Sequence, residues 1–118
     1  MSNQSLGSFG EKLAANYLKE QGYKILSHNF RTKLGELDII ALDADILCAI
    51  EVKTRSSRAF GLPEEFINRT KLEKMRQCLE IYQAKFKTRS QSLRLDLLVI
   101  ECPDNKVSRL ELIKNIFL

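Results

Sequence analysis

The chain has 118 residues and a mass of 13.6 kDa, so we expect one domain over residues 1–118. Hydrophobic residues make up 44% and charged residues 29% of the chain, a balance that excludes a disordered protein. No apolar run approaches the ~20 residues of a membrane helix, and the first twenty residues lack the apolar block of a secretory signal. We therefore expect a cytoplasmic protein that has no membrane partner.

The net charge of +4 is unevenly distributed along the sequence. Residues 52–94 hold eleven basic and four acidic side chains, so this stretch carries +7 and the rest of the chain −3. A positive region on an otherwise acidic chain is what binding to a phosphate backbone requires. A solvated helix face rich in lysine and arginine has the same composition, so charge alone leaves both interpretations open.

Cysteine and histidine usage excludes several kinds of site. Cys48, Cys78 and Cys102 form no CxxC pair, and we expect them to be buried reduced thiols. A structural zinc site would need more ligands at closer spacing. His28 is the single histidine, and we interpret it as an ordinary residue on a strand surface rather than as a catalytic base.

The first half of the chain predicts one helix and three strands. Apolar residues at three- and four-residue steps predict a helix over residues 8–21, which Gly22 ends. A strand follows over 23–30. Two nearly continuous apolar strands, 36–42 and 46–53, flank a turn at 43–45. Strands that are apolar on both faces belong in the middle of a sheet that is covered on both sides.

The second half predicts one helix and two strands. A loop over 56–63 leads to a long amphipathic helix over about 68–87, and strands follow over 93–101 and 107–113. This order predicts an α/β domain with a mixed central sheet of about five strands flanked by helices. The second helix suits a crossover connection between two strands of the sheet.

Two acids are expected to face each other across the predicted hairpin. If the hairpin folds at residues 44 and 45, the numbers of paired residues sum to 89, so Asp38 lies across from Glu51 on one face. Two carboxylates this close repel each other unless a cation lies between them or one of them is protonated.

A divalent cation resolves that repulsion, because Mg²⁺ prefers hard oxygen ligands and typically takes one or two carboxylates. Lys53 lies two residues along the same face and could hold an attacking water or offset charge on a phosphate. Such a site would cleave phosphodiesters. The alternative is an ordinary ion pair of these acids with Lys53 and Arg55, and the spacing alone does not separate the two.

The ordered motifs resemble a known superfamily. A helix glutamate is followed by Gly35-Glu36-Leu37-Asp38-Ile39-Ile40 and then by Ile50-Glu51-Val52-Lys53-Thr54-Arg55. This order resembles PD-(D/E)xK nucleases, in particular archaeal Holliday-junction resolvases, and resembles most closely the YraN-like family of small bacterial proteins. The resemblance implies a restriction-endonuclease-like core. It departs from the superfamily pattern at Leu37, where proline is usual.

The resemblance also implies roles for individual residues. Asp38, Glu51 and the backbone carbonyl of Val52 would hold Mg²⁺ or Mn²⁺, and Lys53 would be the catalytic lysine. Glu11 would complete the acidic site from the first helix. For Glu11 a structural alternative remains, because Ser8-Phe9-Gly10-Glu11 reads as a helix capping box.

Further polar residues have two interpretations each. Arg55, Lys71 and Lys74 are candidates for nucleic-acid contacts. Arg55 could instead neutralise Asp43 or Glu36, and Lys71 could equally be solvated. Asp96 lies in an apolar strand and could orient Lys53 or a metal-bound water, although a salt bridge with Arg94 or with a helix lysine explains a buried acid better.

These observations favour a metal-dependent, nuclease-like protein that acts on DNA, on branched or damaged DNA in particular, and that forms a homodimer to cut two strands. The alternatives are a non-catalytic nucleic-acid-binding module that keeps the nuclease fold, and a small interaction protein whose acids are structural.

Overall fold

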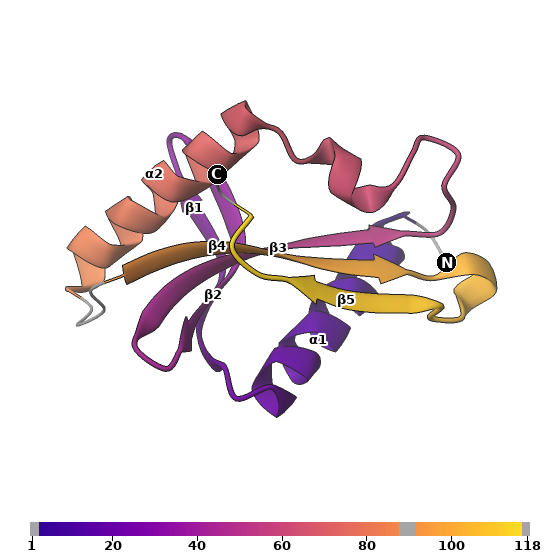
Figure 1. Cartoon of the computed structure of the whole chain (residues 1–118), viewed down its shortest axis with the longest axis horizontal. Coiled ribbons are helices and arrows are strands. Elements are labelled where there is room, and N and C mark those ends of the chain that lie inside the picture. Colours follow the sequence, from indigo (N-terminus) through magenta and orange to yellow (C-terminus); the bar gives the residue numbers. More distant parts are fainter. Residues whose placement is uncertain (1–2, 88–91, 117–118) are drawn as a thin grey trace.

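A computed structural model describes residues 3–87 and 92–116, which form one sheet between two helices (Figure 1). Along the chain the elements are α1 (Asn3–Glu20), β1 (Lys24–Thr32), β2 (Gly35–Asp43), β3 (Ile46–Arg55), η1 (Pro63–Phe66), α2 (Arg69–Phe86), β4 (Ser92–Glu101), η2 (Pro103–Asn105) and β5 (Arg109–Ile113), where η marks a short 3₁₀ helix. The predicted α/β class and the predicted order of helices and strands are confirmed.

In the described part of the chain, five strands form a mixed sheet in the order β1-β2-β3-β4-β5. Strands β3 and β4 are parallel and the other neighbours are antiparallel. Helix α2 connects the parallel pair, as expected of a crossover connection. The three central strands are those whose sequences are apolar on both faces, because each face of the sheet is covered.

Each face of the sheet is buried under its own helix. Helix α1 lies on one side and α2 on the other (Figure 1). Because strand side chains alternate in direction, Ile50 packs with Leu18 under α1 while Ala49 packs with Leu79 under α2. The same alternation sends Glu51 to the α2 side of the sheet.

Helix α1 begins five residues earlier than the sequence predicted. The predicted start at residue 8 followed the apolar periodicity, and residues 3–7 contain a single apolar side chain, Leu6. Ser8 therefore lies past the first turn, where backbone N–H groups bond within the helix, and it is not the N-cap. The capping-box interpretation of Glu11 is wrong for this reason.

Asp96 belongs to a buried polar network on β4. It accepts hydrogen bonds from Arg94 Nε at 2.9 Å, the Tyr23 hydroxyl at 3.1 Å and the Asn115 N–H at 3.0 Å. The predicted ion pair with Arg94 is confirmed, and the oxygens of Asp96 contact these groups rather than Lys53. The network satisfies a carboxylate that is fully buried.

Cys48, Cys78 and Cys102 are buried, as expected. Burial raises the pKa of the Cys48 thiol to about 12, which keeps this thiol protonated. His28 lies exposed on β1. Within the described residues, neither long helix has an apolar stretch of the length that spans a bilayer.

Candidate active site

The candidate site lies where β2 separates from β3. The β2–β3 ladder pairs Asp43 with Ile46 and Ile39 with Ile50, the register predicted from the sequence, and it ends there. Beyond this point β2 stays paired with β1, and β3 stays paired with β4 as far as Arg55. The two strands therefore open a fork, and Asp38 and Glu51 are the first residues past the last paired rung.

At the fork the Asp38 side chain accepts a hydrogen bond that the backbone of β2 would accept if the ladder continued. Its Oδ2 accepts from the Val52 backbone N–H at 2.9 Å. In an extended strand the N–H and C=O of one residue point to the same side, so the Val52 carbonyl also faces the fork.

The Asp38 carboxyl is strongly perturbed. Burial raises the pKa of Asp38 to about 7, and the negative charge of Glu51 adds to the rise, while the Val52 N–H opposes it. Glu11 raises it further by its charge. Acids from α1, β2 and β3 thus act on each other at this point of the structure.

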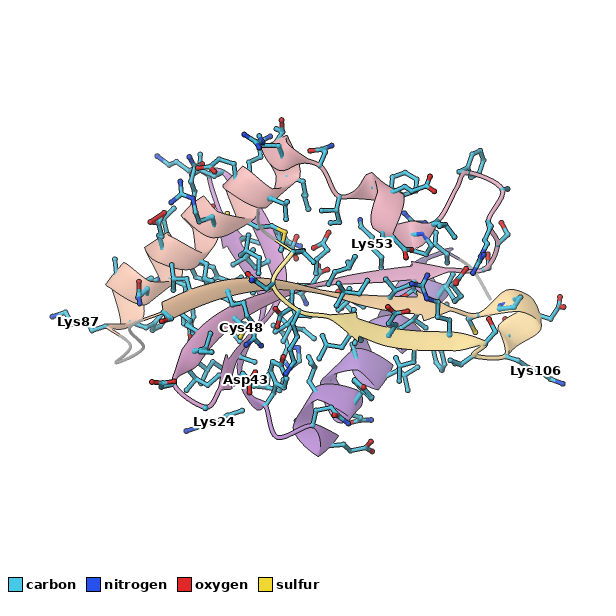
Figure 2. The ribbon with its side chains drawn as sticks, viewed as in Figure 1. Lys24, Asp43, Cys48, Lys53, Lys87 and Lys106 are labelled. Carbon is cyan, nitrogen blue, oxygen red and sulfur yellow. The ribbon has the colours of Figure 1, made fainter. Side chains whose placement is uncertain are left out.

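Glu51 is buried and two lysines hold it. Its side chain is 5% exposed, and its Oε2 lies 3.4 Å from Lys53 Nζ and 3.2 Å from Lys71 Nζ. Lys53 lies on the α2 side of the sheet near the C-terminal end of β3 (Figure 2). Lys71 comes from the first turn of α2, where Asn68 caps the helix by accepting from the Lys71 N–H at 2.8 Å.

The close approach of α1 to β3 places Glu11 at the site. Gly10 is buried, and a Cβ atom added there would lie 1.9 Å from Oγ1 of Thr54. Glycine is therefore required where the helix meets the strand, and the next residue, Glu11, faces the fork.

A cleft of about 550 Å³ lies at the fork. Of the residues singled out from the sequence, Glu11, Asp38, Glu51, Val52, Lys53 and Arg55 line it. The Arg55 guanidinium lies 4.7 Å from the centre of the Phe66 ring, and its Nη1 donates to the Thr54 carbonyl at 3.1 Å. The sequence left open an ordinary ion pair of the two acids with Lys53 and Arg55. Of these contacts, the structure contains the one between Lys53 and Glu51.

Two predicted nucleic-acid contacts lie in different surroundings. Lys71 contacts Glu51, while its own side chain is 37% exposed. Lys74 is exposed three residues further along α2 and does not line the cleft.

Sequence reasoning missed the loop that closes the cleft. Ser56, Ser57, Phe60 and Gly61 line it, whereas the sequence predicted only a loop here. An aromatic residue among glycine, serine and arginine is the signal that could have singled out Phe60. Among the described residues, no group of three or more His, Cys, Asp or Glu side chains is arranged to hold a metal ion by itself.

Similar proteins exist in many bacteria. A relative from Clostridium kluyveri, a UPF0102 protein, is 40% identical over 116 residues, which are 98% of this chain and 95% of the relative. Another UPF0102 protein, from Thermodesulfovibrio yellowstonii, is 43% identical over 94% of this chain and 96% of its own length. A UPF0102 protein of Clostridium botulinum is 44% identical over 98% of this chain and 95% of its own length.

A family model matches most of the chain. The model of the uncharacterised protein family UPF0102 matches residues 10–100, a span that begins one residue before Glu11 and contains β1, β2, β3 and α2. The resemblance to the YraN-like family is confirmed by this match. The chain belongs to the UPF0102 family.

Proposed function

We propose that this protein is a metal-dependent, nuclease-like hydrolase that acts on DNA phosphodiesters, on branched or damaged DNA in particular. The observation that carries the proposal is the pair of acids Asp38 and Glu51 at the strand fork, in one cleft with Lys53. Burying two mutually repelling carboxylates lowers stability, so a structural role alone explains them poorly.

The donor set fits Mg²⁺ or Mn²⁺. Both ions prefer hard oxygen ligands, and the carboxylates of Asp38 and Glu51 with the carbonyl of Val52 supply such oxygens. Burial raises the pKa of Asp38, and the neighbouring charges of Glu51 and Glu11 add to the rise, so a cation bound here would favour the charged form of this carboxyl. When bound, such an ion would lower the pKa of a coordinated water and stabilise charge on the phosphate.

The remaining site residues have separate roles in this proposal. Lys53 and Lys71 would stabilise the negative charge that develops on the phosphate oxygens, and Lys53 can also orient a water. Glu11 would support the site from α1. Each chain has one such cleft on its described part, so cutting both strands of a branched DNA would take two copies of the chain, in a homodimer.

Contacts to the DNA backbone would come from Arg55, Lys71 and Lys74. Arg55 lines the cleft, and Lys71 and Lys74 are three residues apart and so share one face of α2. Binding through such residues falls as salt concentration rises, because each contact releases counterions.

The test is Mn²⁺-dependent cleavage of single-stranded, duplex, flapped and four-way-junction DNA. Glu51→Gln keeps the shape of the side chain and removes its charge, so we expect a loss of roughly 100-fold or more in cleavage rate. Glu20→Gln, at the exposed end of α1, is the matched control and should cleave as the wild type does. Equal cleavage by both variants would contradict the proposal that Glu51 belongs to the cleaving site.

The non-catalytic binding module is favoured by one observation of its own. Lys53 and Lys71 both approach Glu51, so the chain itself supplies positive charge where a cation would bind. This alternative predicts salt-sensitive DNA binding without cleavage, unchanged in Lys53→Ala. A protein that neither binds nor cleaves DNA would instead be a small interaction protein whose acids are structural.

A further inference from the structure

Phe60 is the most exposed large apolar side chain of the described residues. It is 88% exposed, whereas the next, Phe86, is 53% exposed. Single exposed apolar side chains are common on protein surfaces. Phe60 differs from them in its location, because it lines the cleft that holds Asp38, Glu51 and Lys53.

Phe60 lies in a tight turn that a backbone hydrogen bond closes. The Gly61 N–H donates to the Arg58 carbonyl at 3.0 Å, which closes a turn with Ala59 and Phe60 at its centre. Gly61 adopts a φ of +100°, a conformation that glycine adopts without strain. The turn thus presents Phe60 at the rim of the cleft.

An ion pair connects this turn to the sheet. Arg58 donates to both carboxylate oxygens of Glu101 on β4, at 2.7 and 2.9 Å. Glu101 is itself buried and also accepts from Arg109 of β5 at 3.3 Å. The base of the turn is therefore held to β4 directly and to β5 through Glu101. The Phe60 ring lies at the exposed tip of the turn.

A phenyl ring at the rim of a polar cleft can recognise one part of a nucleic acid. It offers no hydrogen bond and no charge to a phosphate, but each nucleobase has an apolar face against which an aromatic ring stacks. Inside a duplex, neighbouring base pairs already cover both faces of every base. A base is available for stacking in a single strand, at a flap or at a branch point.

We propose that Phe60 stacks on an unpaired base beside the phosphodiester in the cleft, so that the site selects nucleic acid with unpaired nucleotides over continuous duplex. This inference rests on the proposed function and names the substrate feature that the same site reads. Phe60 is a specificity-determining residue in this scheme, and the acids and lysines carry the chemistry.

The chain contains no tryptophan, so Phe60→Trp places a single fluorescent reporter at the rim. With Ca²⁺ present, titration with a short single-stranded oligonucleotide should quench its emission, and a blunt-ended duplex of the same sequence should quench it far less. Phe86→Trp is the control, because this exposed residue ends α2 beside Lys87, and Lys87 lies well apart from Lys53 along the molecule (Figure 2). Its emission should stay unchanged by the single strand.

Binding by Phe60→Ala completes the test. Loss of one stacked base should weaken single-strand binding roughly 5- to 150-fold, the equivalent of about 1–3 kcal/mol, and leave binding of the blunt-ended duplex within about twofold. Phe60→Tyr keeps the ring and should bind the single strand as the wild type does.

The outcomes separate the two proposals. If Glu51→Gln abolishes cleavage while Phe60→Trp is not quenched and Phe60→Ala keeps the wild-type preference, stacking is refuted and the nuclease proposal stands. If no oligonucleotide binds to the wild type or is cleaved by it, both proposals are overturned. Quenching with a loss of single-strand preference in Phe60→Ala supports stacking.

Discussion

At the scale of single residues, Asp38 at the strand fork both stabilises the fold and belongs to the candidate site. Its Oδ2 replaces a backbone acceptor for the Val52 N–H, which stabilises the end of β3. The same carboxyl lies beside Glu51, which destabilises its charged form. A residue under both influences couples the stability of the fold to the charge state of the site.

Asp38 should make the metal-free protein more stable at pH 5 than at pH 8. A carboxyl whose pKa is about 7 in the folded state and near 4 in the unfolded state binds its proton more readily when folded. The penalty for its charge is therefore present above pH 7 and is relieved as the pH falls through 7. In EDTA we expect a gain of about 1–3 kcal/mol between pH 8 and pH 5, measured by urea unfolding.

Asp38→Asn should remove this dependence, since an amide does not titrate. Arginines lower the pKa values of other carboxyls, such as Asp43 and Glu101. Protonation of these carboxyls destabilises the folded protein only at lower pH, so it does not mask the contribution of Asp38. Asp45→Asn, in the exposed turn after β2, is the control and should keep the wild-type profile. A profile that is equally steep in Asp38→Asn would show that another group titrates.

The same variant tests the metal site. Mn²⁺ should raise the melting temperature of the wild type by mass action, because it binds the folded state, and Asp38→Asn should abolish the rise. A full rise in Asp38→Asn would place the bound ion elsewhere on the protein.

At the scale of secondary-structure elements, the sequence predicted the strands better than the start of the first helix. Continuous apolar runs set the bounds of β2 and β3 closely, and the turn at residues 44 and 45 gave their register, because alternate side chains face alternate cores. The first turn of α1 carries almost no apolar signal, so periodicity could not find it. The sequence could not predict where the β2–β3 ladder ends, because this depends on the twist of the sheet and on whether β2 stays paired with β1 or with β3.

Within the site, local motifs predicted the residues of β2 and β3, and tertiary packing decided the rest. Asp38, Glu51 and Lys53 share a face by strand alternation alone. That Lys71 reaches Glu51 depends on where α2 begins and on how it lies against the sheet. The position of Phe60 depends on the long-range ion pair between Arg58 and Glu101, which local sequence does not encode.

The contact between α1 and β3 should tolerate no side chain at Gly10. Gly10→Ala would place a Cβ atom within 3 Å of two atoms of Thr54, so the helix or the strand must move. We expect a loss of about 1–3 kcal/mol in the free energy of unfolding. Under the proposed function, cleavage should also fall, since Glu11 moves with the helix.

Gly7→Ala is the matched control on the same helix. Nothing lies within 4 Å of a Cβ added there, so the better helix propensity of alanine should stabilise the protein by about 0.5–1 kcal/mol. Thr54→Gly removes the atoms that clash and should recover part of the loss when combined with Gly10→Ala. Purely additive effects of these two substitutions would rule out a direct contact between the residues.

At the scale of the whole molecule, the positive region is smaller than the sequence indicates. Of the basic side chains that the structure describes in residues 52–87 and 92–94, five contact acids: Lys53, Arg58, Lys71, Arg76 and Arg94. Arg58 fastens its loop to β4, Arg94 of β4 pairs with Asp43 at the end of β2, and Arg76 pairs with Glu73 and Glu80 along α2. Among the described residues of this stretch, the charge that remains for a phosphate backbone lies on Arg55, at the cleft, on Arg69 and on exposed lysines of α2 and its C-terminal end.

Lys74 and Arg76 therefore offer a matched comparison of two cations on one helix. In the described part of the chain Lys74 takes part in no ion pair, whereas two glutamates already neutralise Arg76. Lys74→Gln should weaken DNA binding and reduce the slope of log K against log salt by about 1, as loss of one phosphate contact requires. Arg76→Gln should leave the slope unchanged, because its charge is compensated within the helix. Fluorescence anisotropy with a labelled oligonucleotide between 50 and 200 mM KCl measures both slopes. Equal losses in the two variants would show that overall charge, rather than the face of α2 that continues from Lys71, attracts the DNA.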